Sequence, residues 1–122
     1  MAVLSYDLLH GYLTDQQLAA SGICLEGDPC VATLAAAEGR ITFITGFLIT
    51  GEGAKANTIT IDGLHGGPLT FLYSAPNALI VVLPVPTPAS GPNVAISMSY
   101  PPTDVKSRSV VLFGFSAASA PI

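Results

Sequence analysis

Charged side chains are scarce in this sequence. They make up 10% of the 122 residues, against about 25% in a typical soluble domain, and residues 63–103 contain no Asp, Glu, Lys or Arg. The four basic residues, Arg40, Lys55, Lys106 and Arg108, are scattered along the chain. Because binding to phosphate backbones requires clustered Lys and Arg, we expect no nucleic-acid partner.

Long hydrophobic runs are also missing. Mean hydropathy is high, at +0.60, yet the longest apolar run covers only residues 78–83, whereas a spanning helix needs about 18. A secretory signal has a basic region ahead of an apolar block. The N-terminus of this chain does not have this pattern. We therefore expect neither a membrane partner nor a secretory signal.

Cysteine and histidine are too few and too poorly spaced for a metal site. Cys24 and Cys30 could form a bridge across the turn between them, but without a secretion signal we predict free thiols. Together with His10 they would supply three ligands, but no Cys-x-x-Cys or His pair accompanies them. We expect no metal and no cofactor.

Catalytic motifs are likewise absent from the sequence. Asp62 and His65 lie within one expected turn, and no Gly-x-Ser-x-Gly motif is present. Gly51-x-Gly53 is followed by a Thr-rich strand pattern instead of the helix of a nucleotide-binding loop. We predict that the chain is not an enzyme.

What the sequence does contain is a series of short β-type runs separated by Gly, Pro and Asn. Residues 40–50, 58–62, 69–73, 79–83, 93–100 and 109–115 are expected strands, and Gly46 indicates a bulge or bend. Residues 31–34 could add a first strand, although residues 35–38 could instead form a helical turn. The pattern predicts an all-β fold, a β-sandwich of jelly-roll type, whose expected core is Ile41, Phe43, Phe47, Ile59, Ile61, Phe71, Val81, Ile96, Met98 and Phe113.

The run at residues 79–83 is apolar on both faces, so we expect it to be buried on both sides. Pro84, Pro86 and Pro88 follow at alternate positions, and proline cannot donate to a strand ladder. This segment must therefore be an edge or an extended connection. We predict that it contributes to contacts between copies of the chain.

Residues 1–29 differ from the rest and are expected to form an N-terminal arm ahead of a sandwich domain at residues 30–122. Residues 14–17 match a helix capping box, and Gly22 is a plausible stop for a short helix. The arm carries too many apolar side chains to remain exposed to water. The residues expected to contact a partner protein or a neighbouring subunit are Leu4, Tyr6, Leu8, Leu9, Tyr12 and Leu13.

A soluble monomer with so few charges would tend to associate. Many strands are polar only through Ser and Thr, and such faces can be buried without the desolvation cost of charges. We therefore predict a homodimer or homotrimer.

One part of the chain resembles a known group of proteins. Residues 44–54 (ITGFLITGEGA), 58–64 (TITIDGL), 67–73 (GPLTFLY) and 111–115 (VLFGF) are similar to a module of small virion proteins from tailed phages and prophages. The resemblance is to head decoration, or cement, proteins of jelly-roll type. It covers about two thirds of the chain and leaves out the arm.

This resemblance implies a bacteriophage virion protein that binds the major capsid protein and stabilises the shell. It would lie on the surface of the phage head after assembly in the host cytoplasm. The alternative is a minor tail, fibre or head-spike module that binds a host surface or carbohydrate. The absence of Trp and the scarcity of Tyr count against that alternative, because such sites usually present an aromatic platform.

Overall fold

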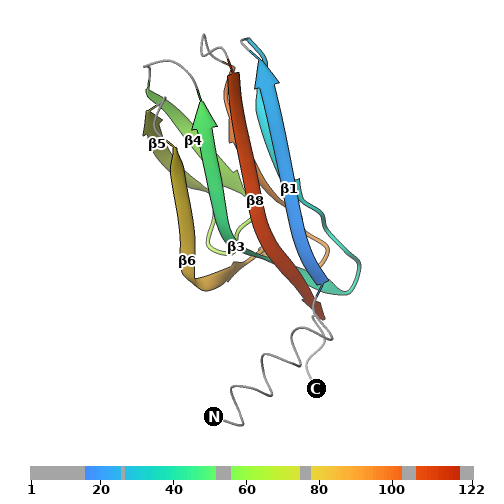
Figure 1. Ribbon diagram of the computed structural model, residues 1–122. Coiled ribbons are helices and arrows are strands. Elements are labelled where there is room, and N and C mark those ends of the chain that lie inside the picture. The colour runs from blue at the N-terminus through green and yellow to red at the C-terminus, as the bar shows by residue number, and fades with distance from the viewer. Residues whose placement is uncertain (1–15, 26, 52–55, 75–77, 103–106, 119–122) are drawn as a thin grey trace.

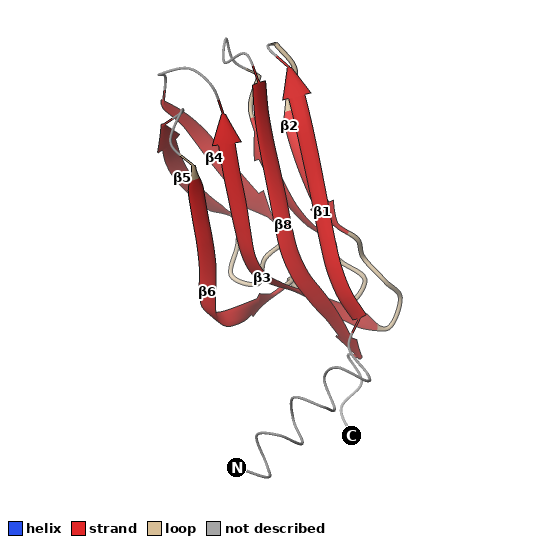
Figure 2. Cartoon of the chain, in the orientation of Figure 1, coloured by secondary structure: helices blue, strands red, loops and turns tan. Residues whose placement is uncertain are grey.

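The computed structural model describes residues 16–25, 27–51, 56–74, 78–102 and 107–118. In these residues eight strands form two four-stranded sheets that pack face to face, and no helix occurs (Figures 1 and 2). All the strand pairs are antiparallel. The predicted all-β, two-sheet architecture is confirmed.

The strands of the two sheets alternate along much of the chain. Sheet A has the order β1 (Gln16–Leu25), β8 (Ser107–Ala118), β3 (Arg40–Gly51) and β6 (Leu79–Pro88). Sheet B has the order β2 (Cys30–Leu34), β7 (Ile96–Tyr100), β4 (Ala56–Asp62) and β5 (Leu69–Ser74). The edge strands are therefore β1 and β6 in sheet A, and β2 and β5 in sheet B.

The expected short helix is wrong over the part that the structure describes, because residues 16–22 belong to β1. Gln16 lies opposite Ser116 and Leu25 opposite Ser107, so the strand pairs with β8 along its whole length. Leu18 and Ala20 pack against the core. A helix this short is marginal by itself, whereas strand pairing satisfies the same backbone groups and buries the same side chains. Thr14 and Asp15 lie outside the described residues.

Gly22 has a role in β1 other than the predicted helix stop. A Cβ atom on this residue would lie 2.6 Å from the carbonyl oxygen of Val31. Only glycine therefore allows the end of β1 to approach β2 this closely.

The prediction of free thiols is also wrong, because Cys24 and Cys30 form a disulfide. Cys24 lies in β1 and Cys30 begins β2, and the turn between them brings their Cα atoms to 5.4 Å, within the range a disulfide requires. The bond joins sheet A to sheet B at the β1/β2 edge.

Arg108 is buried at the same end of the sandwich, near the start of β8. Its Nη2 atom donates to the carbonyl oxygens of Leu25, at 3.0 Å, and of Asp28. Its guanidinium lies 5.3 Å from the centre of the Tyr100 ring. Arg108 therefore satisfies backbone acceptors in the turn that carries the disulfide.

The core confirms half of the predicted residues as fully buried: Phe47, Ile59, Ile61, Ile96 and Met98. Phe71 and Val81 are partly buried and pack against them. Ile41 and Phe43 were predicted inside but lie on the other face, because β3 changes register between Ile44 and Gly46. A bulge adds one residue, so the face that is inward before it is outward after it.

Phe113 was also predicted in the core, but it is 44% exposed. Both faces of β8 are apolar in this region, and Val110 and Leu112 are the residues that point inward. The alternation of apolar and polar residues therefore does not show which face of β8 points into the core.

Tyr73 and Tyr100 pack edge to face within the core, with ring centres 5.8 Å apart. Burial raises the pKa of both phenols; near Tyr100, a hydrogen bond from Asn57 and the charge of Arg108 act in the opposite direction. The Tyr73 hydroxyl is buried and has no hydrogen-bond partner among the described residues.

We expect Tyr73→Phe to stabilise the protein by about 1 kcal/mol, because it removes an unsatisfied buried hydroxyl. Both phenols have folded-state pKa values above the unfolded value of about 10. Their contribution to stability is therefore complete below pH 10 and is lost as the pH rises through the folded-state values. Urea unfolding at pH 8 and pH 10.5 measures both effects, and the variant should lose less stability between these two pH values than wild type. A loss of more than 1 kcal/mol at pH 8 would contradict this account.

Candidate interaction surface

The outer face of sheet A carries apolar side chains on all four strands, and its polar residues, among them Ser21, Thr50 and Ser109, are uncharged. Its apolar residues are Ile23 on β1, Val111, Phe113 and Phe115 on β8, Phe43 and Leu48 on β3, and Ile80 and Val82 on β6. We call this set the apolar face. It looks toward the viewer in Figure 1, where sheet A lies in front of sheet B.

The strand register makes the apolar face continuous. Leu48 lies between Val111 on one side and Ile80 on the other. Phe43 lies opposite Phe115, and their rings stack with centres 4.8 Å apart. These contacts join side chains of three neighbouring strands into one surface.

Much of this surface is open to solvent in the single chain. Ile23 is 81% exposed, Ile80 is 70% exposed and Val82 is 80% exposed. The prediction that residues 79–83 are buried on both sides is therefore wrong, because β6 is an edge strand whose outer side chains meet no other part of the described chain. Exposed apolar side chains that are gathered on one face are typical of a surface that contacts a partner.

None of the charged side chains in the described part of sheet A points toward this surface. Arg40 and Arg108 are the charged residues of its four strands. Arg40 instead donates from Nε to Ser116 Oγ, at 2.9 Å, and Ser116 is buried. A partner could therefore cover the apolar face without desolvating a charge.

The proline segment lies on the free edge of β6, as the sequence predicted for an edge. Pro84 and Pro86 are exposed, and Pro88 is half-buried opposite Phe43. Between Val82 and Thr87 the ladder with β3 is interrupted. Because proline has no N–H to donate, this half of the edge can pack against a partner but cannot extend the sheet.

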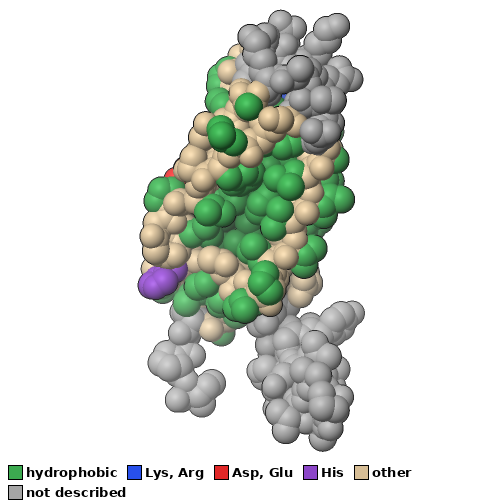
Figure 3. All heavy atoms as spheres, turned by 90° about the vertical axis from the view of Figure 1, so that its left-hand side faces the viewer, with side chains coloured by type: hydrophobic (Ala, Val, Ile, Leu, Met, Phe, Trp, Pro, Cys, Tyr) green, Lys and Arg blue, Asp and Glu red, His purple; other side chains and the backbone are tan. Residues whose placement is uncertain are grey.

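A second opening lies between the sheets at the β5/β6 edge. It is a cavity of about 350 Å³ lined mainly by apolar side chains, among them Ile44, Phe47, Ile61, Leu69 and Leu83. Figure 3 looks onto this edge and shows hydrophobic side chains gathered along its centre, between borders of polar and backbone atoms. Here the core is not covered by the described residues.

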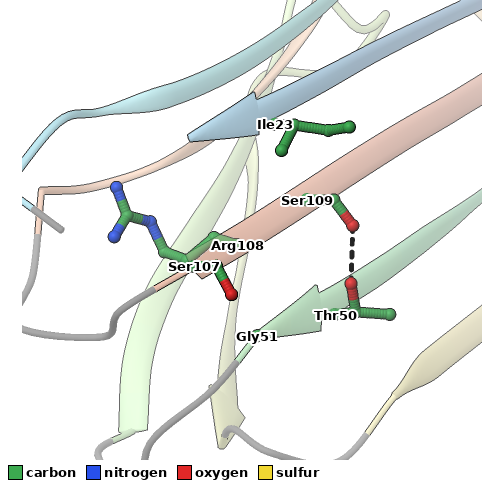
Figure 4. Close-up of a pocket in the computed structure, with 6 residues that line it drawn as sticks. All are labelled: Ile23, Thr50, Gly51, Ser107, Arg108 and Ser109. Carbon is green, nitrogen blue, oxygen red and sulfur yellow. Dashed lines mark hydrogen bonds between the residues drawn. The ribbon is translucent and has the colours of Figure 1, made fainter. Parts of the chain in front are cut away.

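A hollow at the other end of sheet A, of about 340 Å³, has a different character (Figure 4). The side chains of Thr50 and Ser109 point toward one another, and Thr50 Oγ1 lies 2.5 Å from Ser109 Oγ. Arg108 extends away from them. Ile23, Gly51 and Ser107 complete its lining. The lining contains no carboxylate, imidazole or thiol that could act as an acid, base or nucleophile.

The predicted arm contacts, Leu4, Tyr6, Leu8, Leu9, Tyr12 and Leu13, lie outside the described residues. His65 is exposed and lies at the lining of the cavity between the sheets. No group of three metal-ligating side chains occurs within the described ranges, and none of the described residues belongs to a helix that could cross a membrane.

No protein-family model matches the sequence, and no curated protein matches it either. Among solved structures, the chain is similar to a ruminal GH26 endo-β-1,4-mannanase, with 15% identity and a TM-score of 0.36. That match covers 80% of this chain but only 19% of the mannanase.

Two smaller structures match over most of their length. One is a virus-like particle of the extra small virus of the giant freshwater prawn Macrobrachium rosenbergii, with 8% identity, coverage of 87% of this chain and 81% of that chain, and a TM-score of 0.40. The other is a family 11 carbohydrate-binding module from Clostridium thermocellum, with 9% identity, coverage of 87% and 90%, and a TM-score of 0.36.

Proposed function

We propose that this chain is a non-catalytic structural protein of a bacteriophage virion, a decoration or cement protein that binds the major capsid protein on the head surface. The observation that carries the proposal is the apolar face of sheet A, which is exposed and free of charged side chains among the described residues. The resemblance of residues 44–54 and 58–64 to phage virion proteins agrees with it.

The energetics of this face suit a contact that is repeated many times. Burying Ile23, Ile80 and Val82 is worth about 1.5–3 kcal/mol each before ordering costs. The contact of a single chain would therefore be modest. Copies that are linked to one another on a symmetric shell would gain avidity without any new contact.

We further infer that the sandwich is a jelly roll. Eight strands in the orders β1-β8-β3-β6 and β2-β7-β4-β5 support this inference, because consecutive strands such as β1 and β2 fall in different sheets. The first and last strands, β1 and β8, lie side by side. This topology presents one broad sheet face to a flat partner such as a capsid surface.

Self-association is the second part of the proposal. We propose a homodimer or homotrimer that uses the Pro84, Pro86 and Pro88 edge together with the predicted arm contacts at residues 4–13. The exposure of Pro84 and Pro86 on a free edge supports this role. Obligate interfaces usually bury about 2,000 Å² or more, so the contact would have to extend beyond the proline edge.

The disulfide fits a position on the outside of the particle. We propose assembly in the host cytoplasm, which keeps thiols reduced. The Cys24–Cys30 bond would then close once particles are released into an oxidising medium.

The test measures binding to phage heads. Heads of the phage or prophage whose genome encodes the chain should contain it in many copies, and heads prepared without it should take it up to a fixed stoichiometry from solution. Quantitative mass spectrometry of purified heads gives the copy number. If the chain is absent from heads, or is found only on separated tails, the head decoration role is wrong.

A further inference from the structure

The cavity between the sheets lies where β6 leaves its ladder with β3. From Gly46 to Ile44, β3 advances by two residues, while the opposite stretch of β6, from Val82 to Thr87, takes five. β6 therefore has three extra residues at this point, and they do not pair with β3. Two of the intervening residues are prolines, whose φ angles are fixed. This side of the cavity is therefore stiff.

The turn beside the cavity, residues 63–67, is fastened to the end of β6 by backbone hydrogen bonds. His65 N donates to the carbonyl oxygen of Pro88, at 2.9 Å, and Ser90 N donates to that of Gly63, at 2.8 Å. The two ends of the cavity wall are thus tied to each other. The cavity is preformed, as ligand sites usually are.

The lining combines an apolar floor with a polar rim. Four buried side chains make the floor: Ile44, Phe47, Ile61 and Leu64. Leu69 and Leu83 are more exposed and complete the apolar part. At the rim lie His65, which is exposed, and Thr87, which is half-buried. None of the described residues that line the cavity is Asp, Glu, Lys or Arg. A matching ligand has an apolar body and one hydrogen-bonding group that stays near water.

The volume of the cavity, about 350 Å³, sets the size of this ligand. A cavity of about 150 Å³ that is lined by Leu, Ile and Phe binds benzene. A molecule roughly twice the size of benzene, with about a dozen non-hydrogen atoms, therefore fits here.

The apolar surface continues beyond the cavity along the β5/β6 edge. Phe47 in the floor stacks with Phe71 of β5, with ring centres 5.5 Å apart. Leu79 and Val81 of β6 are partly buried further along this edge. Figure 3 shows the apolar side chains that run along it. An elongated apolar surface of this kind suits a flexible aliphatic chain better than a compact ring system.

We propose that the cavity binds a free single-chain aliphatic amphiphile of about ten carbons, a medium-chain fatty acid or alcohol. The chain lies against Ile44, Phe47 and Ile61, and the head group stays at the rim beside His65 and Thr87. The site is complete within one copy of the chain. Binding therefore requires neither self-association nor phage heads, and it goes beyond the proposed decoration role.

Isothermal titration calorimetry of the full-length chain with hexanoate, octanoate and decanoate, each below its micelle concentration, measures this binding. We expect one molecule per chain and an affinity that rises about fourfold with each buried methylene. 1-Decanol should bind within about tenfold of decanoate, because the head group lies outside the apolar part. Decanoate should also raise the Tm of the chain, since it binds the folded state.

Leu83→Trp fills the cavity from β6, and its matched control is Val85→Trp. Val85 lies on the same strand, is 71% exposed and does not line the cavity. We expect Leu83→Trp to weaken decanoate binding at least 20-fold and the control to stay within twofold of wild type. Leu69→Trp, at a lining residue that is 46% exposed, narrows the cavity from β5 and gives the same test if Leu83→Trp fails to fold by circular dichroism.

Four results would overturn the proposal. The first is the absence of saturable binding of decanoate and 1-decanol, and the second is unchanged affinity in the folded tryptophan variants. The third is NMR chemical-shift changes at Ile80 and Val82 instead of Ile44 and Ile61, which would place the chain on the apolar face. The fourth is flotation of the protein with phosphatidylcholine vesicles, which would identify a membrane instead of a free molecule. A protein that binds decanoate but not phage heads would refute the decoration role alone.

Discussion

Glutamate at positions 80 and 82 should abolish binding to phage heads while leaving the chain folded. Ile80 and Val82 are apolar, exposed and adjacent on the outer face of β6. The substitutions remove about 3–6 kcal/mol of binding free energy, because Ile80 and Val82 are no longer buried against the head. The two new charges would also have to be desolvated. Since 1.4 kcal/mol corresponds to a tenfold change in affinity, we expect binding to weaken at least 100-fold.

The matched control for this variant is Leu72→Glu. Leu72 is 74% exposed, like the two β6 residues, but lies on the outer face of sheet B. The free energy of unfolding of both proteins should lie within about 1 kcal/mol of the wild-type value, because substitutions at exposed positions have small effects. Co-sedimentation with heads measures binding. Equal loss of binding in the control would mean that the apolar face is not the specific contact.

Gly114→Ala should destabilise the fold more than any surface change, by about 3 kcal/mol. Gly114 lies inward on β8, between β1 and β3. A Cβ atom at this position would overlap the carbonyl oxygen of Phe43 and would lie 2.8 Å from Leu34 Cδ1. The Phe43 oxygen belongs to the backbone of the neighbouring strand, so relief requires the two strands to separate.

Gly91→Ala is the control, because a Cβ atom there would meet nothing within 4 Å. We expect it to be neutral or slightly stabilising, since alanine reduces the entropy of the unfolded chain. Thermal unfolding should show a fall of about 10 °C for Gly114→Ala and little change for Gly91→Ala. A Gly114→Ala protein as stable as wild type would show that β8 and β3 are not packed this closely.

The sequence predicted the candidate surface only in part. The prolines of β6 predicted an edge, and the edge is confirmed. The apolar face was missed, because Phe43 and Phe113 were assigned to the core and Ile80 and Val82 were expected to be covered. One sequence signal could have revealed the apolar face. Several strands are apolar on both faces, and a chain of this length cannot cover both faces of all these strands.

The error at Phe43 has a simple geometric origin. The sequence predicts a bulge or bend at Gly46, but alternation alone does not show which residues of the strand change face. Because one added residue exchanges the two faces of a strand, Ile41 and Phe43 moved outward while Phe47 and Ile49 stayed inward.

The sequence by itself determined the all-β class, the positions of most turns and the scarcity of charge. These properties follow from local patterns, since the alternation of Ile59, Ile61, Ile96 and Met98 reports a strand whatever its neighbours are. Only the tertiary structure decided that Gln16–Leu25 is a strand, that Cys24 meets Cys30 and that β6 is an edge with one face uncovered. Strand pairing depends on residues far apart, such as Gln16 and Ser116, and local alternation carries no information about which partner will cover which face.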